Sequence, residues 1–266
     1  MALGIDVGGS KILAAVVEDG RITREWSYKT KDGEVIQTLK SIIRESGESV
    51  VGIGVPCYIR DGICVKAPHI KELTGRELKD IVMDARYMND CSAIAYGEYY
   101  LRDEKYDPLL LVALGTGVGA GLVVRGMPYV GRGSALEIGH IKKYSERRCE
   151  CGKTGCLETV IGGRYAGTKD MYLRAKDRDE DALKFFESYG KTLAYGLAPA
   201  IQLFDPEIVV IGGSISQAYD YFIPSFLAEL EELLSYITPD DIIFERAKSL
   251  KSGTIGAALI AERGLI

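Results

Sequence analysis

Basic residues are not in excess in this chain. The 266 residues include 33 Lys and Arg against 38 Asp and Glu, which gives a net charge of −5. Sequence-independent binding of DNA or RNA requires a basic surface that neutralises phosphates. We therefore exclude nucleic acid as a partner.

Long apolar runs and low-complexity linkers are also missing. No apolar stretch reaches the roughly 20 residues that a membrane-spanning helix needs. The apolar strand pattern begins by Leu3, with no basic segment or cleavage signal ahead of it. We therefore expect a cytoplasmic protein that does not contact a membrane. The length allows one large α/β domain or two smaller lobes.

Apolar periodicity predicts alternating strands and helices. We expect strands at about 2–6, 11–17, 21–28, 50–55, 86–88, 109–114 and 207–211, and helices at about 33–46, 76–83, 91–102, 180–203, 216–234 and 255–263. Asp107-Pro108 breaks the pattern near the middle of the chain. We place a lobe boundary there, with lobes at 1–108 and 109–251, and expect the C-terminal helix, about 252–266, to return to the first lobe.

Both predicted lobes open in the same way. Gly4–Ala15 and Leu111–Leu122 each contain an apolar strand, a glycine turn and a second apolar strand. This repetition predicts two related α/β lobes with a cleft between them.

The glycine turns are candidates for phosphate binding. Asp6-Val7-Gly8-Gly9-Ser10-Lys11 is not a Walker loop, but its backbone N–H groups could contact a phosphate closely. Asp6 could hold Mg²⁺ through water. A tight hairpin stabilised by the Asp is the structural alternative for a single turn. Because a matching turn follows Leu114, and Gly212-Gly213 ends a third strand, we favour phosphate binding.

Asp90 is the candidate general base. It lies between a predicted strand and a predicted helix, where an Asp often serves only as a helix N-cap. It could instead accept a proton from a substrate hydroxyl that Asn89 orients. The neighbouring phosphate-type turns favour catalysis.

A cluster of thiols and an imidazole predicts a zinc site. His140, Cys149, Cys151 and Cys156 form a complete tetrahedral ligand set within the loop 140–156, so a structural Zn²⁺ is favoured over a catalytic one. The second imidazole nitrogen could then contact a substrate hydroxyl. We interpret the scattered Cys57, Cys64 and Cys91 as reduced core thiols, in preference to disulfides.

The chain resembles the sugar kinases of the ROK (repressor, open reading frame, kinase) family along essentially its whole length. The metal loop with its flanking Glu137 and Glu158 is the specific part of this resemblance, whereas the glycine turns are shared with the wider actin-like ATPase superfamily. The resemblance implies an α/β fold of two actin-like (ribonuclease H-like) lobes, with ATP and sugar in the cleft between them. It also implies Mg²⁺ as a cofactor and a homodimer or larger homo-oligomer.

The resemblance also implies roles for individual residues. Asp90 corresponds to the catalytic base, and Asn89, Glu137, His140 and Glu158, together with Asp90, correspond to sugar contacts. The residues that correspond to nucleotide contacts are Asp6, Gly8, Gly9, Ser10, Lys11, Gly115, Thr116, Gly117, Gly119, Gly212 and Gly213.

The resemblance favours an ATP-dependent hexose kinase that phosphorylates the primary (6-) hydroxyl, with glucose as the first expectation. N-acetylmannosamine or another N-acetylhexosamine is the alternative substrate. Cys57-Tyr58 and Pro68-His69 depart from the family pattern near the sugar, so the exact sugar stays open. A third departure, Cys91-Ser92, should affect helix packing more than chemistry. A sugar-sensing protein without turnover is the non-enzymatic alternative. We reject a repressor because no DNA-binding segment precedes Asp6.

Overall fold

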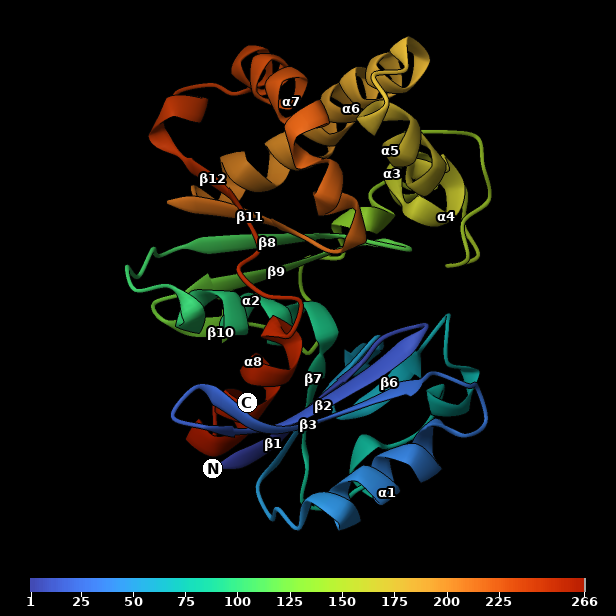
Figure 1. Cartoon of the computed structure of the whole chain (residues 1–266), viewed down its shortest axis with the longest axis vertical. Helices are drawn as coiled ribbons and strands as arrows, with labels where there is room; N and C mark the ends of the chain where they lie inside the picture. The colour runs from blue at the N-terminus through green and yellow to red at the C-terminus, as the bar shows by residue number, and fades with distance from the viewer. Residues whose placement is uncertain (266) are drawn as a thin grey trace. The chain divides into compact units, whose positions relative to one another are not determined.

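The structure, a computed structural model, describes residues 1–265 and has a mixed α/β fold with two five-stranded sheets (Figure 1). The chain divides into two compact units. The first contains residues 1–105, 121–136 and those from 248 onward, and the second contains residues 106–120 and 137–247. The segment 121–136 belongs to the first unit. It packs on the helix at 90–101.

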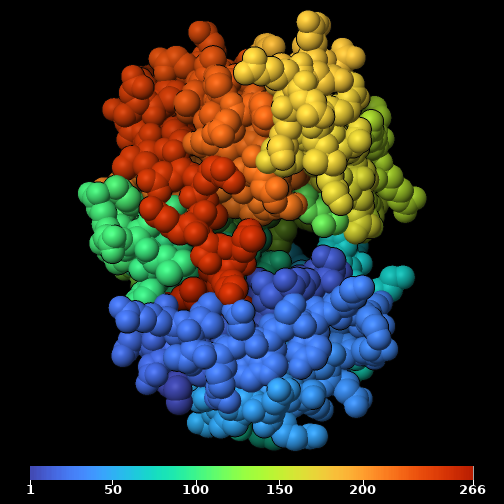
Figure 2. Space-filling model, viewed as in Figure 1, coloured from blue at the N-terminus to red at the C-terminus, as the bar shows by residue number. Residues whose placement is uncertain are grey.

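The sheet of the first unit has the order β3-β2-β1-β4-β7. Its strands are β1 (Ala2–Val7), β2 (Lys11–Glu18), β3 (Arg21–Lys29), β4 (Val51–Val55) and β7 (Arg86–Asn89). The first three form an antiparallel meander, and β1, β4 and β7 run parallel. β3 is mostly exposed and forms part of the visible surface (Figure 2).

Three helices cover this sheet. On α1 (Val35–Ser46), Val35, Leu39 and Ile42 recur at helical spacing and pack into a core with the apolar residues of β1, β2 and β4. α2 (Asp90–Leu101) and α8 (Ser252–Arg263) pack against each other, and α8 also contacts β1 and β4. The two chain ends therefore lie close together in this unit, where the Met1 amino group pairs with Glu262 (Figure 1).

A small hairpin joins β4 to the rest of the unit and corrects one prediction. β5 (Tyr58–Arg60) and β6 (Ile63–Lys66) are antiparallel, and their pairing brings the Cα atoms of Cys57 and Cys64 to 5.6 Å. The two cysteines form a disulfide, so the expectation that both are reduced thiols is wrong. Cys91 is buried and is not part of a disulfide, as predicted.

The predicted helix at 76–83 is also wrong. Only a 3-10 turn, η2 (Leu78–Asp80), forms there. Gly75 adopts a left-handed φ of 81°, and Glu77 makes an isolated bridge to Ile63. The apolar residues of this segment therefore pack as a loop beside the hairpin.

The second sheet has the order β10-β9-β8-β11-β12. Its strands are β8 (Leu109–Leu114), β9 (Val118–Val124), β10 (Met127–Tyr129), β11 (Ile208–Gly212) and β12 (Ile243–Arg246). β8, β11 and β12 are parallel, and β8 and β11 are almost continuously apolar because both are buried. The sequence predicted β8 and β11 but missed β10 and the half-exposed β12.

The helices of the second unit are α3 (Glu158–Ile161), α4 (Gly163–Ala166), α5 (Thr168–Lys176), α6 (Glu180–Phe204) and α7 (Tyr219–Leu233). Asp179 is the N-cap of α6, and its side chain accepts the N–H of Ala182 at 3.0 Å. Asp205 is the C-cap and has the left-handed conformation. α6 packs along α7. Among residues 1–265, no helix combines the length and the apolar character needed to cross a bilayer.

The contact between α2 and α8 requires glycine and generates a testable prediction. A Cβ atom at Gly256 would lie 1.8 Å from the carbonyl oxygen of Ala93. Because a backbone atom cannot move aside cheaply, we expect Gly256→Ala to lower the free energy of unfolding by about 2–3 kcal/mol, measured by urea denaturation. Gly54→Ala is the control, since its nearest neighbour would be 3.4 Å away. Equal stability of the two variants would contradict this account of the contact.

Candidate functional site

The first group of predicted site residues lies at one edge of the first sheet. Asp6 is next to last in β1, Asn89 ends β7, and Asp90 begins α2. The strand register pairs Asp6 with Gly54, and Gly54 with Met88, so these residues lie at the carboxyl ends of adjacent parallel strands. This is the edge of an α/β sheet where ligands usually bind.

The turn between β1 and β2 is held in one conformation. The N–H of Gly8 donates to the carbonyl of Lys11 at 2.9 Å, and the Thr30 hydroxyl donates to the carbonyl of Gly8 at 2.7 Å. Gly9, Ser10 and Lys11 are exposed. The turn can therefore present backbone N–H groups to an anion, and Thr30, which sequence reasoning missed, supports it from β3's end.

The structure separates the two roles considered for Asp90. Asn89 is the N-cap of α2, because its side chain accepts the N–H of Cys91 at 3.0 Å, and its amide donates to the carbonyl of Cys57 at 3.4 Å. Asp90 is therefore the first helical residue, although its Oδ1 also lies 2.9 Å from the N–H of Cys91. N-capping does not account for Asp90.

Burial changes the acidity of both carboxyl groups at this edge. It raises the pKa of Asp90 from 3.8 to about 6, although the hydrogen bond from Cys91 opposes the change. Burial, with a smaller contribution from the charge of Asp90, raises the pKa of Asp6 to about 7. A carboxylate with a pKa near 6 can accept a proton at neutral pH.

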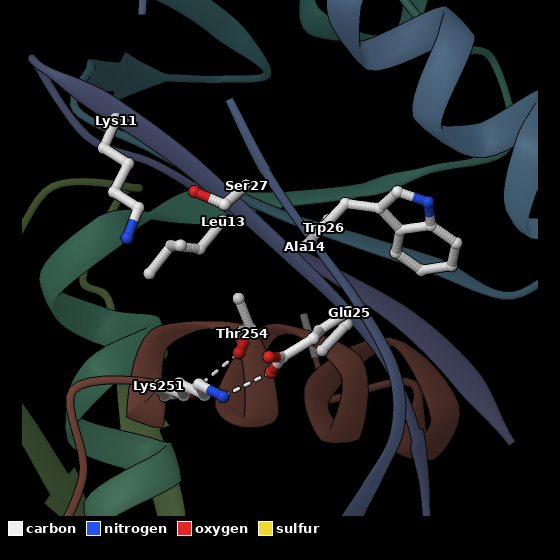
Figure 3. Close-up of a pocket in the computed structure, with 9 residues that line it drawn as sticks. Lys11, Leu13, Ala14, Glu25, Trp26, Ser27, Lys251 and Thr254 are labelled. Carbon is white, nitrogen blue, oxygen red and sulfur yellow. Dashed lines mark hydrogen bonds and ion pairs between the residues drawn. The ribbon is translucent and has the colours of Figure 1, made fainter. Parts of the chain in front are cut away.

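A pocket of about 180 Å³ adjoins the β1–β2 turn. It lies beside β2, β3 and the start of α8, and Lys11 and the Lys251–Glu25 ion pair point toward it (Figure 3). Its lining residues are Lys11, Leu13, Ala14, Ala15, Glu25, Trp26, Ser27, Lys251 and Thr254. Of these residues, only Lys11 was predicted from the sequence to be a site residue. The others come from separate segments of the chain that are brought together only in the folded protein.

In the second unit, Glu158 is bonded to the other glycine turn. Its Oε2 accepts the N–H of Val118 at 3.0 Å, and a Cβ atom at Gly117 would lie 2.3 Å from the same oxygen. The carbonyls of Gly115 and Thr116 accept N–H groups from residues 163 and 164. The turn at 115–119 and the carboxylate of Glu158 are therefore one structural assembly.

The four predicted metal ligands come together. The ligand atoms of His140, Cys149, Cys151 and Cys156 all lie within 4.8 Å of one another. The Cys151 and Cys156 sulfurs are 3.5 Å apart, and Nδ1 of His140 is 3.8 Å from the Cys149 sulfur. A tetrahedral ion with metal–sulfur bonds of about 2.3 Å would hold its sulfurs roughly 3.8 Å apart. The cluster can therefore hold a metal ion that prefers thiolate and imidazole.

Two further groups adjoin this cluster. Nε2 of His140 is 4.0 Å from Oε2 of Glu137, so the imidazole has one nitrogen near the sulfurs and the other near a carboxylate. The ammonium group of Lys142, which sequence reasoning missed, is 2.7 Å from the Cys156 sulfur. Lys142 therefore places a positive charge directly beside the sulfur cluster.

The third glycine junction follows β11. Gly213 has a φ of 81°, and a Cβ atom there would lie 2.3 Å from the carbonyl of Leu114. Glycine is therefore required where β11 leads into the 3-10 turn η4 (Ser214–Ala218).

The predicted site residues thus form two groups. The first unit contains the β1–β2 turn with Asp6, Asn89 and Asp90. The second unit contains Glu137, Glu158, the Cys/His cluster, the turn at 115–119 and the junction at 212–213.

Comparison with known proteins identifies the family. A model of the ROK family matches residues 2–264. The chain belongs to the ROK family. It is 27% identical to an N-acetyl-D-glucosamine kinase of Histophilus somni, with 98% of both chains covered. It is 29% identical to a glucokinase of Thermotoga maritima, with 94% of this chain and 96% of the relative covered.

A solved structure of a ROK glucokinase from Streptomyces griseus, in complex with glucose and AMPPNP, is similar in fold. The TM-score is 0.85 at 27% identity, and 99% of both chains are covered. The predicted family and the predicted actin-like α/β fold class are therefore confirmed.

The raised pKa of Asp90 predicts a pH-dependent stability. An acid whose pKa is higher in the folded state stabilises the fold at low pH, and this contribution is lost as the pH rises from about 4 to about 6. We expect Asp90→Asn to raise the free energy of unfolding at pH 8 by on the order of 2 kcal/mol, after allowance for partial exposure. The gain should disappear near pH 4. Urea denaturation at both pH values, with the exposed Asp84→Asn as control, measures it. A gain that is the same at both values would contradict the burial argument.

Proposed function

We propose that the protein is an ATP-dependent sugar kinase that transfers the γ-phosphoryl group to the primary hydroxyl of a hexose, with glucose as the first candidate. The observation that carries this proposal is the position of Asp90, a partly buried carboxylate with a raised pKa beside Asp6 and the β1–β2 turn. Membership of the ROK family and the likeness to a glucokinase that binds glucose and AMPPNP support it.

The residues of the first unit would deprotonate the acceptor and hold the phosphates. Asp90 accepts the proton of the primary hydroxyl as its oxygen attacks the γ-phosphorus, and Asn89 orients that hydroxyl. The exposed turn Gly8–Lys11 contacts phosphate oxygens through backbone N–H groups and the Lys11 ammonium. Asp6 would hold Mg²⁺, which when bound offsets the charge of the phosphate oxygens. Mg²⁺ prefers oxygen ligands, and the carboxylate of Asp6 at the end of its strand supplies them.

The residues of the second unit would complete the nucleotide and sugar contacts. In this proposal, the turn at 115–119 contacts phosphates, and Gly212-Gly213 lies near the adenosine. Glu137, His140 and Glu158 bind sugar hydroxyls. One oxygen of Glu158 already accepts the Val118 N–H, so the sugar would meet the other oxygen. The same carboxylate then links the phosphate turn to the sugar contacts.

We propose a structural zinc ion as the occupant of the Cys/His cluster. Three thiolates and one imidazole are a closed ligand set for zinc, which leaves no position for a reacting water. The ion would stabilise the loop 140–156, and through it Glu137 and Glu158. A homodimer or larger homo-oligomer, the cytoplasmic location and the lobe boundaries drawn from the sequence stay predictions.

The alternative substrate is an N-acetylhexosamine, because the chain is also similar to an N-acetyl-D-glucosamine kinase. We expect ADP release with ATP and Mg²⁺ on one of glucose, mannose, fructose, N-acetylglucosamine and N-acetylmannosamine, and the ratios of kcat/KM should identify the sugar. Asp90→Asn should retain sugar binding by calorimetry but lose at least about 100-fold in kcat. Turnover by the variant at the normal rate would refute the mechanism. Sugar binding without turnover by the unchanged protein would favour the sugar-sensing alternative.

Replacing one metal ligand tests whether the metal ion orders the sugar-binding residues. We expect Cys151→Ser to purify with less than one zinc per chain and to have a raised KM for the sugar, because the loop that carries the sugar contacts loses its anchor. Elemental analysis and steady-state kinetics measure both effects. Cys91→Ser is the control, since Cys91 is in no disulfide and lies outside the cluster. A zinc-free variant with normal sugar affinity would show that the metal does not order the sugar contacts.

A further inference from the structure

The first turn of α8 lies directly against the carboxyl group of Asp6. A Cβ atom built on Gly253 would be 2.5 Å from Oδ2 and 2.7 Å from Cγ of Asp6. The Asp6 carboxyl group therefore occupies the space that any larger residue at position 253 would fill. Gly253 has an ordinary helical backbone, so glycine is not required there for its conformational freedom. The structure explains the glycine at position 253 by the space that the Asp6 carboxyl group needs.

A buried carboxylate on α2 holds this turn in place. The side chain of Glu98 is 0% exposed and accepts the N–H groups of Lys248 at 2.9 Å and Ser249 at 3.3 Å. It also accepts the hydroxyl of Ser252, the first residue of α8. These three bonds connect Glu98 to the segment that leads into α8 and to its first residue.

The charge of Glu98 is balanced inside the same cluster. Nη1 of Arg102 donates to Oε2 of Glu98 at 2.6 Å and to its carbonyl at 2.8 Å, and Arg102 is also buried. A buried carboxylate is tolerated only when it is paired and its oxygens are hydrogen-bonded, and Glu98 meets both conditions. A neutral amide at this position could not accept all of these bonds. The position therefore requires a carboxylate in particular.

The spacing along α2 connects this cluster to the proposed base. Asp90 begins α2, and Glu98 lies two turns later on the same helix. At Gly97, an added Cβ would lie 1.9 Å from the carbonyl of Ser252, so the backbones of the two helices are in direct contact there. One rigid helix thus carries Asp90 and, through Glu98, holds the turn that adjoins Asp6.

We propose that Gly253 and Glu98 are positioning residues for the magnesium–nucleotide complex. Glu98 fixes the first turn of α8, and Gly253 leaves the space in which the Asp6 carboxylate is held. This inference rests on the proposed function in one respect, because it takes Asp6 as the residue that holds the divalent cation. The inference concerns the placement of the Asp6 side chain and not the proton transfer at Asp90.

Gly253→Ala tests the inference with little risk to folding. Alanine favours the helix more than glycine does, and the three atoms nearest to an added Cβ all belong to the side chain of Asp6. We expect the variant to bind Mn²⁺ in the presence of AMPPNP about 10-fold more weakly or worse, measured by electron paramagnetic resonance. The free energy of unfolding and sugar binding should stay unchanged. In turnover, the dependence on Mg²⁺ should shift to higher concentration while KM for the sugar remains normal.

Thr254→Ala is the matched control. It removes side-chain atoms from the next residue of the same turn, where the hydroxyl bonds only the carbonyl of Lys251. It should bind Mn²⁺ as the unchanged protein does. Normal Mn²⁺ affinity in Gly253→Ala, or equal losses in both variants, would overturn the role of Gly253.

Glu98→Gln tests the other half of the inference. We expect a several-fold loss of Mn²⁺ affinity in the presence of AMPPNP, and Glu98→Asp should not restore it, because the shorter side chain cannot reach the N–H groups at 248 and 249. Since Glu98→Gln leaves a buried Arg102 unbalanced, Glu98→Gln/Arg102→Gln is made beside it. If a folded variant of either kind binds Mn²⁺ normally, Glu98 has no positioning role.

The binding assay also separates this inference from the proposed function. Mn²⁺ and AMPPNP binding requires no sugar and no turnover. If the unchanged protein phosphorylates no sugar but Gly253→Ala still weakens Mn²⁺ binding, the kinase proposal fails and the positioning role stands. If the unchanged protein is an active kinase and Gly253→Ala binds Mn²⁺ normally, the positioning role fails alone. Absence of Mn²⁺ binding in the unchanged protein overturns the inference.

Discussion

The first unit depends on the direct contact of α8 with the backbone of its sheet and of α2. Glycine stands at each point of closest approach. An added Cβ would lie 1.8 Å from the carbonyl of Thr254 at Gly4 and 2.0 Å from that of Ala257 at Gly52, and similar contacts occur at Gly97 and Gly256. Without these glycines the helix could not lie on β1 and β4, because close packing leaves no space for side chains. The edge that carries Asp6 and Asp90 is a consequence of this packing.

The raised pKa values of the carboxyl groups at this edge have the same origin. Asp6 and Asp90 lie among β1, β4, α2 and α8, so the ionised carboxylates lose part of their contact with water. The cost in stability is offset by the apolar core of the unit. In the proposed kinase, this environment supplies a base that is ionised at neutral pH yet still basic enough to accept a proton.

The second unit achieves order in its polar loop by different means. The loop between β10 and α3 contains little regular structure, and its backbone is held by turns with left-handed glycines at 152 and 155. The Cys/His cluster lies within this loop, and Glu158, which follows the loop at the start of α3, accepts the N–H of Val118. We expect a bound metal to complete this arrangement, because such a loop cannot bury enough apolar surface to be rigid alone.

Sequence periodicity predicted most of the long elements. The buried strands β8 and β11 and the long helix α6 have strong apolar patterns, and such patterns suffice where burial decides the structure. It failed at 76–83, where tertiary pairing to the β5–β6 hairpin replaced a helix. The interpretation of Cys57 and Cys64 as reduced thiols also failed, because only the register of that hairpin brings the two residues together.

The candidate metal ligands, the glycine turns and the family could be recognised from the sequence alone, because these depend on residue types at short, fixed spacings. Only the tertiary structure decided which residues support them. These supporting residues contact groups that are distant in the chain or across a turn, and no local sequence pattern marks them. They are Thr30, Glu98, Lys142 and Gly253. The residue types of a site can therefore be recognised in the local sequence, whereas the positions of these residues in space follow from contacts that form when distant segments pack.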